Sequence, residues 1–333
     1  MLAPAPYPSN QQHYYWTAWG LSEATPDPTL HQRNHTRHAE MKLSEHKKPL
    51  QDMDASNMQG ANEPIRVAHV VSLIHCSRSD RMTGFLDALL ILRHSIHLNS
   101  VHNSNNQQNF SHSSSSSSSR RVSKYSYQMY AIIHETGCYR DHPKLPSLLK
   151  RLGYIPLVRD TPINISEIPN EWYRTHVQHE NCCGSDEFIK LYAYTLTQHP
   201  IVVHWDLDVA VLQPMDDLFD SMLYFKDNPL GMQARKRLQL QRPQTQKLPD
   251  RIDAFVTRDI TSAKPWEKVQ AVQGGFVVAR PSLEHFERFK QFILEADYKP
   301  GRGEGSGWGV SHREASVISF CSILSRSSCT AFH

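Results

Sequence analysis

Two aspartates separated by one residue follow a short apolar segment in the middle of the chain. The segment Ile201–His204 is rich in β-branched residues and predicts a β-strand. Asp206 and Asp208 come next, and residues i and i+2 of an extended segment face the same way. Both carboxylates can therefore reach one cation, and Mg²⁺ or Mn²⁺ commonly takes one or two carboxylates together with substrate phosphates. The spacing predicts a metal site, and the simpler alternative is a pair of strand-end acids in a polar turn.

The two aspartates lie within an alternation of expected strands and helices. The strands are expected at Val67–Ile74, Tyr127–His134, Ile155–Val158, Ile201–His204 and Gly275–Ala279. The helices are expected at Gly84–Leu98, Pro146–Leu152, Asp186–Thr197, Met215–Phe219 and Leu283–Glu295. Directly after Asp208, the segment Val209–Leu212 resumes the apolar run. Such alternation is typical of the α/β class, with a mainly parallel sheet that helices cover on both faces.

Composition and charge narrow the possible functions. The chain has 333 residues, with 36 basic against 33 acidic residues and a net charge of +3, which argues against a nucleic-acid-binding protein. Residues 1–63 and 99–124 are polar, and the second stretch contains a serine run. Neither stretch can bury enough apolar surface to order itself, so both are expected to be disordered. The remaining residues are sufficient for one large domain.

Cysteines and apolar runs give weaker indications. The six cysteines form no Cys-x-x-Cys pair, which argues against a structural zinc site, and their even number permits disulfides without requiring them. No segment reaches about 18 consecutive apolar residues, so no transmembrane helix is expected. The N-terminus lacks the basic stretch and apolar core of a signal peptide.

Three segments resemble a known family. Residues 188–219, FIKLYAYTLTQHPIVVHWDLDVAVLQPMDDLF, contain a Lys-Leu pair on a helix, a strand, Asp-x-Asp, a second apolar strand, a proline and an acidic ending. This order resembles the glycogenin-like family of retaining glycosyltransferases. Residues 272–286, VQGGFVVARPSLEHF, resemble the small-residue strand of that family. Residues 67–96 resemble, more loosely, its opening strand, nucleotide-binding loop and first helix.

The resemblance implies a fold and a reaction. It implies a GT-A type nucleotide-diphospho-sugar transferase fold over residues 64–300, with a serine-rich insertion at 99–124 and an irregular tail at 301–333. The implied reaction is metal-dependent transfer of a hexose, with retention, from a nucleotide-sugar. A UDP-sugar is the expected donor, and the acceptor is an unspecified glycan, protein or small molecule. Members of the family work in the Golgi and secretory pathway or in the cytoplasm.

The resemblance also assigns roles to residues. Asp206 and Asp208 correspond to the ligands of Mn²⁺ or Mg²⁺ and of the donor diphosphate, while Lys190 and Gln273 correspond to catalytic residues beside the donor sugar. The further donor-binding residues that it implies are Ser72, Ile74, Gly274 and Gly275, with His69 near the nucleobase. The plain alternatives are a surface lysine at Lys190 and a bulge or tight strand start at the two glycines. His204 is expected to pack under the sheet.

The C-terminal part departs from the family pattern. The family has an acidic residue followed by Gln after its last helix, and later a His that completes the metal shell. Here Glu304 is the acid near that position and no Gln follows it, while His312 and His333 lack a family-like context. This departure favours the alternative of a catalytically impaired nucleotide-sugar-binding or interaction protein on the same fold. A nucleotidyltransferase is a more distant alternative, because SRSDRMTG at residues 77–84 only loosely resembles a glycine- and basic-rich loop.

Overall fold

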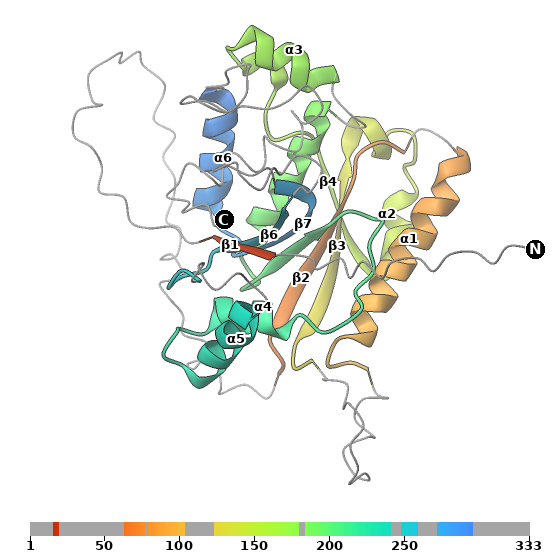
Figure 1. The fold of residues 1–333 in the computed structure, drawn as a ribbon. Helices are drawn as coiled ribbons and strands as arrows, with labels where there is room; N and C mark the ends of the chain where they lie inside the picture. Colours follow the sequence, from red (N-terminus) through yellow and green to blue (C-terminus); the bar gives the residue numbers. More distant parts are fainter. Residues whose placement is uncertain are drawn as a thin grey trace, which may run out of the picture.

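The computed structural model describes residues 16–19, 63–76, 79–103, 123–179, 184–240, 248–258 and 272–295. These residues form one 7-stranded sheet with helices on both sides (Figure 1). The strands are β1 (Trp16–Trp19), β2 (Arg66–Leu73), β3 (Ser126–His134), β4 (Tyr154–Arg159), β5 (Val202–Trp205), β6 (Ala254–Arg258) and β7 (Val272–Ala279). The α-helices are α1 (Ser79–Leu98), α2 (Leu145–Arg151), α3 (Glu171–His179), α4 (Asp216–Leu223), α5 (Pro229–Leu240) and α6 (Leu283–Glu295). A π-helix, η5 (Glu135–Tyr139), and two 3₁₀-helices, η6 (Ile165–Glu167) and η7 (Gly184–Thr195), complete the fold.

The sheet runs mainly parallel. Its strand order is β1-β6-β7-β5-β2-β3-β4. Strands β4, β3, β2 and β5 pair in parallel, whereas β7 pairs antiparallel with both β5 and β6, so that β6 again points in the direction of β5. β1 pairs antiparallel with β6 at the edge of the sheet.

Each face of the sheet carries its own core, because successive residues of a strand point to opposite sides. In β2, Val67 and Val71 belong to the core beneath α1, α2 and α4, whereas Ala68 and Val70 belong to the core beneath α3, η7 and α6. Strands buried on both faces read as continuous apolar runs, as VAHVV does here. Figure 1 shows α1 and α2 on one side of the sheet and α6 on the other. The predicted α/β class, with a mainly parallel sheet and helices on both faces, is confirmed.

In the two long helices, several apolar side chains at helical spacing are buried. Leu89, Leu92 and Ile96 of α1 lie in one core. The same spacing in α6 places Phe286, Phe289 and Ile293 in the other core. Most predicted elements appear within one to three residues of their expected bounds, and the expected helix at Asp186–Thr197 is the 3₁₀-helix η7.

One predicted strand is wrong. Val209–Leu212 is irregular, and the Leu212 side chain is 81% exposed. β5 pairs with β2 and β7 only as far as Trp205, and residues 207–208 form a turn, so Val209–Leu212 does not continue the strand. The predicted elements also lack counterparts of α3, α5, β1 and β6. In α5 the buried residues are Gly231, Ala234 and Leu238, and two of these three are too small to mark a hydrophobic stripe.

Of the polar stretch 1–63 the structure describes β1 and residue 63, and it describes the stretch 99–124 only at its ends. Ser100 and Asn103 are buried, and the Asn99 side chain donates hydrogen bonds to the carbonyls of Ser95 (2.9 Å) and Val211 (2.8 Å). Ser123 is buried where the chain re-enters the fold. Residues 104–122, most of the expected serine-rich insertion, lie outside the described residues, as does the expected tail at 301–333.

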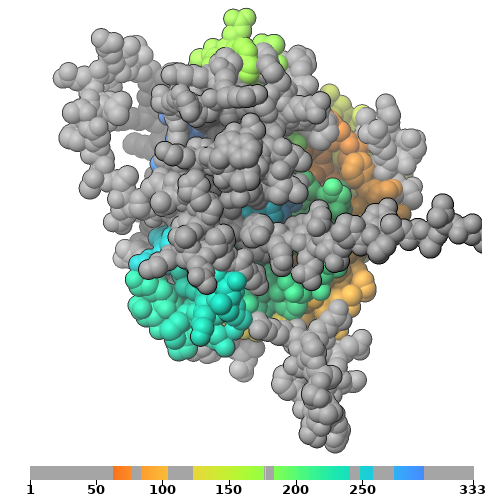
Figure 2. Space-filling model, viewed as in Figure 1, coloured from red at the N-terminus to blue at the C-terminus, as the bar shows by residue number. Residues whose placement is uncertain are grey.

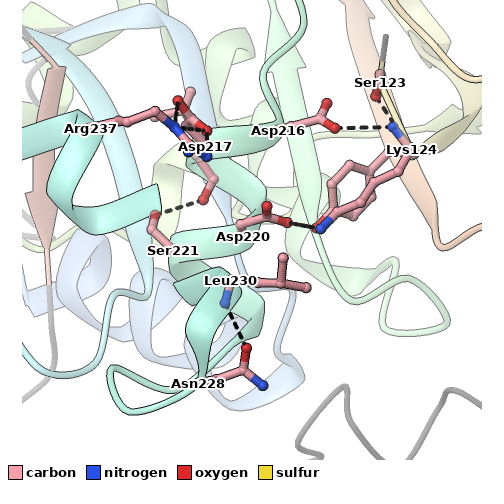
Figure 3. A network of polar contacts seen from close by, with 11 residues as sticks. Ser123, Lys124, Asp216, Asp217, Asp220, Ser221, Asn228, Leu230 and Arg237 are labelled. Atoms are coloured by element: carbon pink, nitrogen blue, oxygen red, sulfur yellow. Dashed lines mark hydrogen bonds and ion pairs between the residues drawn. The ribbon is translucent and has the colours of Figure 1, made fainter. Parts of the chain in front are cut away.

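Acidic residues attach α4 to the start of β3 and to α5 (Figure 3). The buried Asp220 accepts a hydrogen bond from the Tyr125 hydroxyl and forms an ion pair with Lys124 Nζ at 2.8 Å. Arg237 of α5 contacts both carboxylate oxygens of Asp217 through its Nε, at 2.9 and 2.8 Å. These contacts hold the α4–α5 pair, which occupies the lower left of the described surface in Figure 2.

None of the described helices is long and apolar enough to cross a membrane.

Two histidines are buried in neighbouring strands. His69 of β2 accepts a hydrogen bond at Nδ1 from Trp205 Nε1 (3.0 Å), and His204 Nε2 of β5 lies 2.9 Å from Ser72 Oγ, as the expected packing of His204 requires. Burial lowers the pKa of His69 from 6.5 to about 3. Burial, followed by the charge of Lys190, likewise lowers the pKa of His204 to about 3.

These two histidines predict that the protein loses stability in acid. The unfolded chain takes up protons near pH 6.5, whereas the folded chain does so only near pH 3, so stability is full above pH 6.5 and falls as the pH drops towards 3. The expected loss at pH 5 is about 2 kcal/mol per histidine. Urea unfolding of the wild type and of His204→Gln at pH 7.5 and pH 5 measures it. The variant should lose less stability than the wild type, and an equal loss in both proteins would contradict the assignment.

Candidate functional site

The candidate site lies where the strand order reverses. From β2 the chain proceeds to β3 and β4 on one side, and then returns to β5 on the other side of β2. The segments that leave the carboxyl ends of β2 and β5 therefore diverge, and in open α/β sheets such a point forms a crevice for ligands. Asp206 is the first residue after β5, and Ile74 is the first residue after β2. The predicted Asp-x-Asp pair thus lies at the position where the topology favours a site.

A buried lysine is the central charge of this site. Lys190 of η7 has a side chain that is only 9% exposed, and its Nζ lies 3.2 Å from Asp206 Oδ1 and 3.4 Å from Glu187 Oε2. Burial by itself lowers the pKa of Lys190, but the charges of Glu187 and Asp206 outweigh that effect and raise the pKa above its usual value. Lys190 therefore stays protonated, and the alternative of a surface lysine is wrong.

Helix geometry explains the pairing of Glu187 with Lys190. In a 3₁₀-helix the side chains at i and i+3 lie directly above one another, which places Glu187 in line with Lys190. The hydrophobic side of η7 holds the helix on the sheet through Phe188, Ile189 and Leu191. The ammonium is thereby fixed over the end of β5.

Gly275 brings the backbone of β7 against Asp206. The Asp206 backbone N–H donates to the Gly275 carbonyl at 2.8 Å, which continues the pairing of β5 with β7. A Cβ atom at Gly275 would lie 2.7 Å from Asp206 Oδ2. Only glycine leaves this carboxylate in place. Gly274 is buried beside it in the same strand.

The carboxylates of the Asp-x-Asp pair are accessible. The Asp206 side chain is 42% exposed, and Asp208 is exposed in the turn after β5. Within the described segments, no group of three or more His, Cys, Asp or Glu side chains is arranged to hold a metal ion. A divalent ion at Asp206 and Asp208 would therefore take its remaining ligands from elsewhere, and substrate phosphates commonly supply them.

Ser72, Ile74 and His69 are turned into the fold. Ser72 Oγ is occupied by His204, and Ile74 is buried in the core beneath η7. His69 stacks on Trp205 and faces a cavity of about 20 Å³ on the opposite side of the sheet, which is too small for a nucleobase. Gln273 belongs to β7, but its side chain lies outside the described part of the structure, as do Glu304, His312 and His333.

Sequence reasoning missed four residues of this edge. Glu187 is the second partner of Lys190, and its i,i+3 spacing is the signal that could have revealed it. Asp186, also in the first turn of η7, lies 3.0 Å from His75 Nε2 and 4.0 Å from His134 Nε2. No local sequence pattern links Asp186 to the two histidines, because His75 follows β2 and His134 ends β3, more than fifty residues earlier.

Comparisons with known proteins add little to this geometry. No protein-family model and no curated protein sequence matches the chain. Among solved structures, the apo form of mouse xyloside xylosyltransferase 1 resembles it at 9% sequence identity, over 80% of this chain and 84% of that one, with a TM-score of 0.37. A TM-score this low does not indicate a shared function.

Replacing Lys190 with Met should destabilise the fold. It would leave Glu187, whose side chain is 13% exposed, without its cation, and breaking a buried pair in this way costs about 3 kcal/mol. Lys290→Met on α6 is the matched control, because Lys290 also pairs with a glutamate three residues earlier, Glu287, which is 59% exposed. The control should cost less than about 0.5 kcal/mol. Urea unfolding measures both, and equal losses would refute the central role of Lys190.

Gly275→Ala should displace the Asp206 carboxylate at a modest cost of about 1 kcal/mol, because a flexible side chain can yield to the new Cβ atom. Gly84→Ala in α1 is the control, since nothing lies within 4 Å of its Cβ position, and it should stabilise the helix by up to about 1 kcal/mol. In an Asp206→Ala background the cost of Gly275→Ala should disappear. A cost that persists there would show that the added Cβ atom meets a neighbour other than the Asp206 carboxylate.

Proposed function

We propose that this chain is a metal-dependent glycosyltransferase of the GT-A type that transfers a hexose from a UDP-sugar to an acceptor, with retention. One observation carries the proposal: the Asp206–Asp208 pair follows β5 at the reversal of strand order, with a buried lysine against its first carboxylate. Crevices at such positions bind nucleotides in open α/β sheets. The resemblance of the surrounding sequence narrows the ligand to a nucleotide-sugar.

Charge supports the dependence on a metal. Glu187, Asp206 and Asp208 supply three carboxyl groups against the single ammonium of Lys190, so the site has an excess of negative charge. A diphosphate is itself an anion and would be repelled. A divalent cation between the Asp-x-Asp carboxylates and the phosphates removes this repulsion, and Mn²⁺ or Mg²⁺ prefers such oxygen ligands.

The residues of the chain have separate tasks in this reaction. The bond from the anomeric carbon to the diphosphate breaks, a bond from the same carbon to the oxygen of an acceptor hydroxyl forms, and negative charge grows on the departing diphosphate, which can take up the proton that the hydroxyl loses. A bound Mn²⁺ or Mg²⁺ would stabilise that charge. Lys190 holds the Asp206 carboxylate in place, and Gly275 lets it lie close to β7. Gln273, from the start of β7, would contact the sugar hydroxyls.

A second candidate is a protein that binds nucleotide-sugars without transferring them. The sequence after α6 favours it, since no acid–Gln pair follows Glu295 as it does in the family. A sugar that is held loosely reacts slowly, because a misplacement of about 1 Å can cost a hundredfold in rate. Both candidates predict binding, and only the first predicts turnover at about 1 per second or faster with an acceptor.

Asp208→Asn should abolish the Mn²⁺-dependent binding of UDP without unfolding the protein. The substitution removes a charge from an exposed side chain, so stability should stay within about 0.5 kcal/mol of the wild type. Calorimetric titration of UDP with and without Mn²⁺ measures the binding. Asp87→Asn, which also neutralises an exposed aspartate but on α1, is the control and should bind normally. Unchanged Mn²⁺-dependent binding by Asp208→Asn would refute the proposed metal site.

A further inference from the structure

A disulfide bond lies beside the candidate site. It joins Cys76, three residues after β2, to Cys138 in η5, which directly follows β3, with 4.7 Å between the Cα atoms. Both cysteines are buried. β2 and β3 already pair along their whole length, so the bond is not needed to align the strands. It ties together the two segments that leave the strands at the edge where Asp206 lies.

Further contacts bind these two segments. The Cys76 backbone N–H donates to the Gly137 carbonyl at 3.0 Å, and His142 Nε2 donates to the Cys76 carbonyl at 2.6 Å. A Cβ atom at Gly137 would overlap the Ile74 carbonyl oxygen, so η5 packs directly on the chain before Cys76. His75 is thus held between two anchored neighbours.

His75 and His134 both face Asp186. His134 Nδ1 accepts a hydrogen bond from the Gly137 N–H at 3.0 Å, so its ring proton is on Nε2, which lies 4.0 Å from the Asp186 carboxylate. His75 Nε2 is closer, at 3.0 Å from Asp186 Oδ2, and donates to it. Asp186 is therefore fixed from the ends of β2 and β3.

Asp186 and Lys190 belong to the same helix. The first turn of η7 is held by Asp186 at the ends of β2 and β3, and the next turn is held by Lys190 at the end of β5. A shift of the first turn must move Lys190, and with it the carboxylate of Asp206. The covalent bond between Cys76 and Cys138 is the strongest constraint on the segments at the ends of β2 and β3 that contact Asp186.

We propose that the Cys76–Cys138 disulfide, His75 and Asp186 position the candidate site. They fix η7 and therefore Lys190. Reduction of the bond to two thiols, by a dithiol or glutathione that is itself oxidised, releases His75 from Asp186 and weakens ligand binding at Asp206. Since buried disulfides persist in oxidising compartments, the working protein belongs in such a compartment. The part of this inference that concerns ligand binding depends on the proposed function.

A mutant cycle tests the coupling. Cys76→Ala/Cys138→Ala and His75→Ala should each weaken Mn²⁺-dependent UDP binding about tenfold, below the melting temperature of every variant. Combined, they should still weaken it about tenfold, because both act through the same contact. A combined loss near a hundredfold, or no loss without the disulfide, would overturn the proposal. Cys321→Ala/Cys329→Ala removes two other cysteines as the control and should bind normally.

A second readout needs no nucleotide. In protein labelled at histidine, the imidazole NMR signals of His75, assigned by their loss in His75→Gln, should shift in Cys76→Ala/Cys138→Ala to the positions found in Asp186→Asn. Signals that stay at their wild-type positions without the disulfide would overturn the proposal even if UDP does not bind. If the wild type binds no UDP but the His75 signals shift as expected, the proposed function fails. The proposal that the disulfide holds His75 against Asp186 is then still supported.

Discussion

The buried ammonium of Lys190 is the constraint on which this edge of the molecule depends. A charge that is removed from water must be paired, and Lys190 is paired twice, with Glu187 from its own helix and with Asp206 from β5. The first pair requires the in-line i,i+3 geometry of the 3₁₀-helix, and the second fixes how far η7 lies from the strand end. Asp206 in turn fits only because residue 275 of the next strand has no side chain. One charge thus determines the placement of a helix, a strand end and a glycine.

The antiparallel strand β7 makes this arrangement possible. If β7 ran parallel to β5, its carboxyl end would adjoin Asp206; running the other way, it brings its first residues there, including Gly274 and Gly275. The backbone hydrogen bond from Asp206 to Gly275 then extends the ladder by one residue beyond β5. The Asp206 backbone is therefore as rigid as the sheet, while Asp208, two residues on, lies in an exposed turn. A ligand would meet one carboxylate whose backbone is held in the sheet and one in an exposed turn.

The local sequence pattern predicted those helices and strands whose apolar residues are buried along the length of the element. The stripe of Leu89, Leu92 and Ile96 and the apolar run of β2 indicated helix and strand, because each is buried along its length. The same reasoning failed at Val209–Leu212, where a turn at residues 207–208 interrupts the apolar run, and at α5, which packs through Gly231 and Ala234. In the site, the spacing of Asp206 and Asp208 was visible, and a family resemblance placed Lys190 beside the donor sugar, but the burial of Lys190 and its pairing with Glu187 and Asp206 were not predicted. The contacts of Asp186 with His75 and His134 join segments far apart in the chain and could not be read from local spacing.

The double pairing of Lys190 would also let the proposed site accept a cation. The side chain of Glu187 is 13% exposed, whereas that of Asp206 is 42% exposed, so the two partners of the ammonium differ in their access to a ligand. If Lys190 had only Asp206, a cation that drew this carboxylate away would leave a buried charge unpaired, at a cost of several kcal/mol. Because Glu187 remains in contact, Asp206 can turn one oxygen towards a cation while Lys190 keeps a partner. Glu187 is thus the residue that lets the fold keep its buried lysine and still offer the Asp206 carboxylate to a ligand.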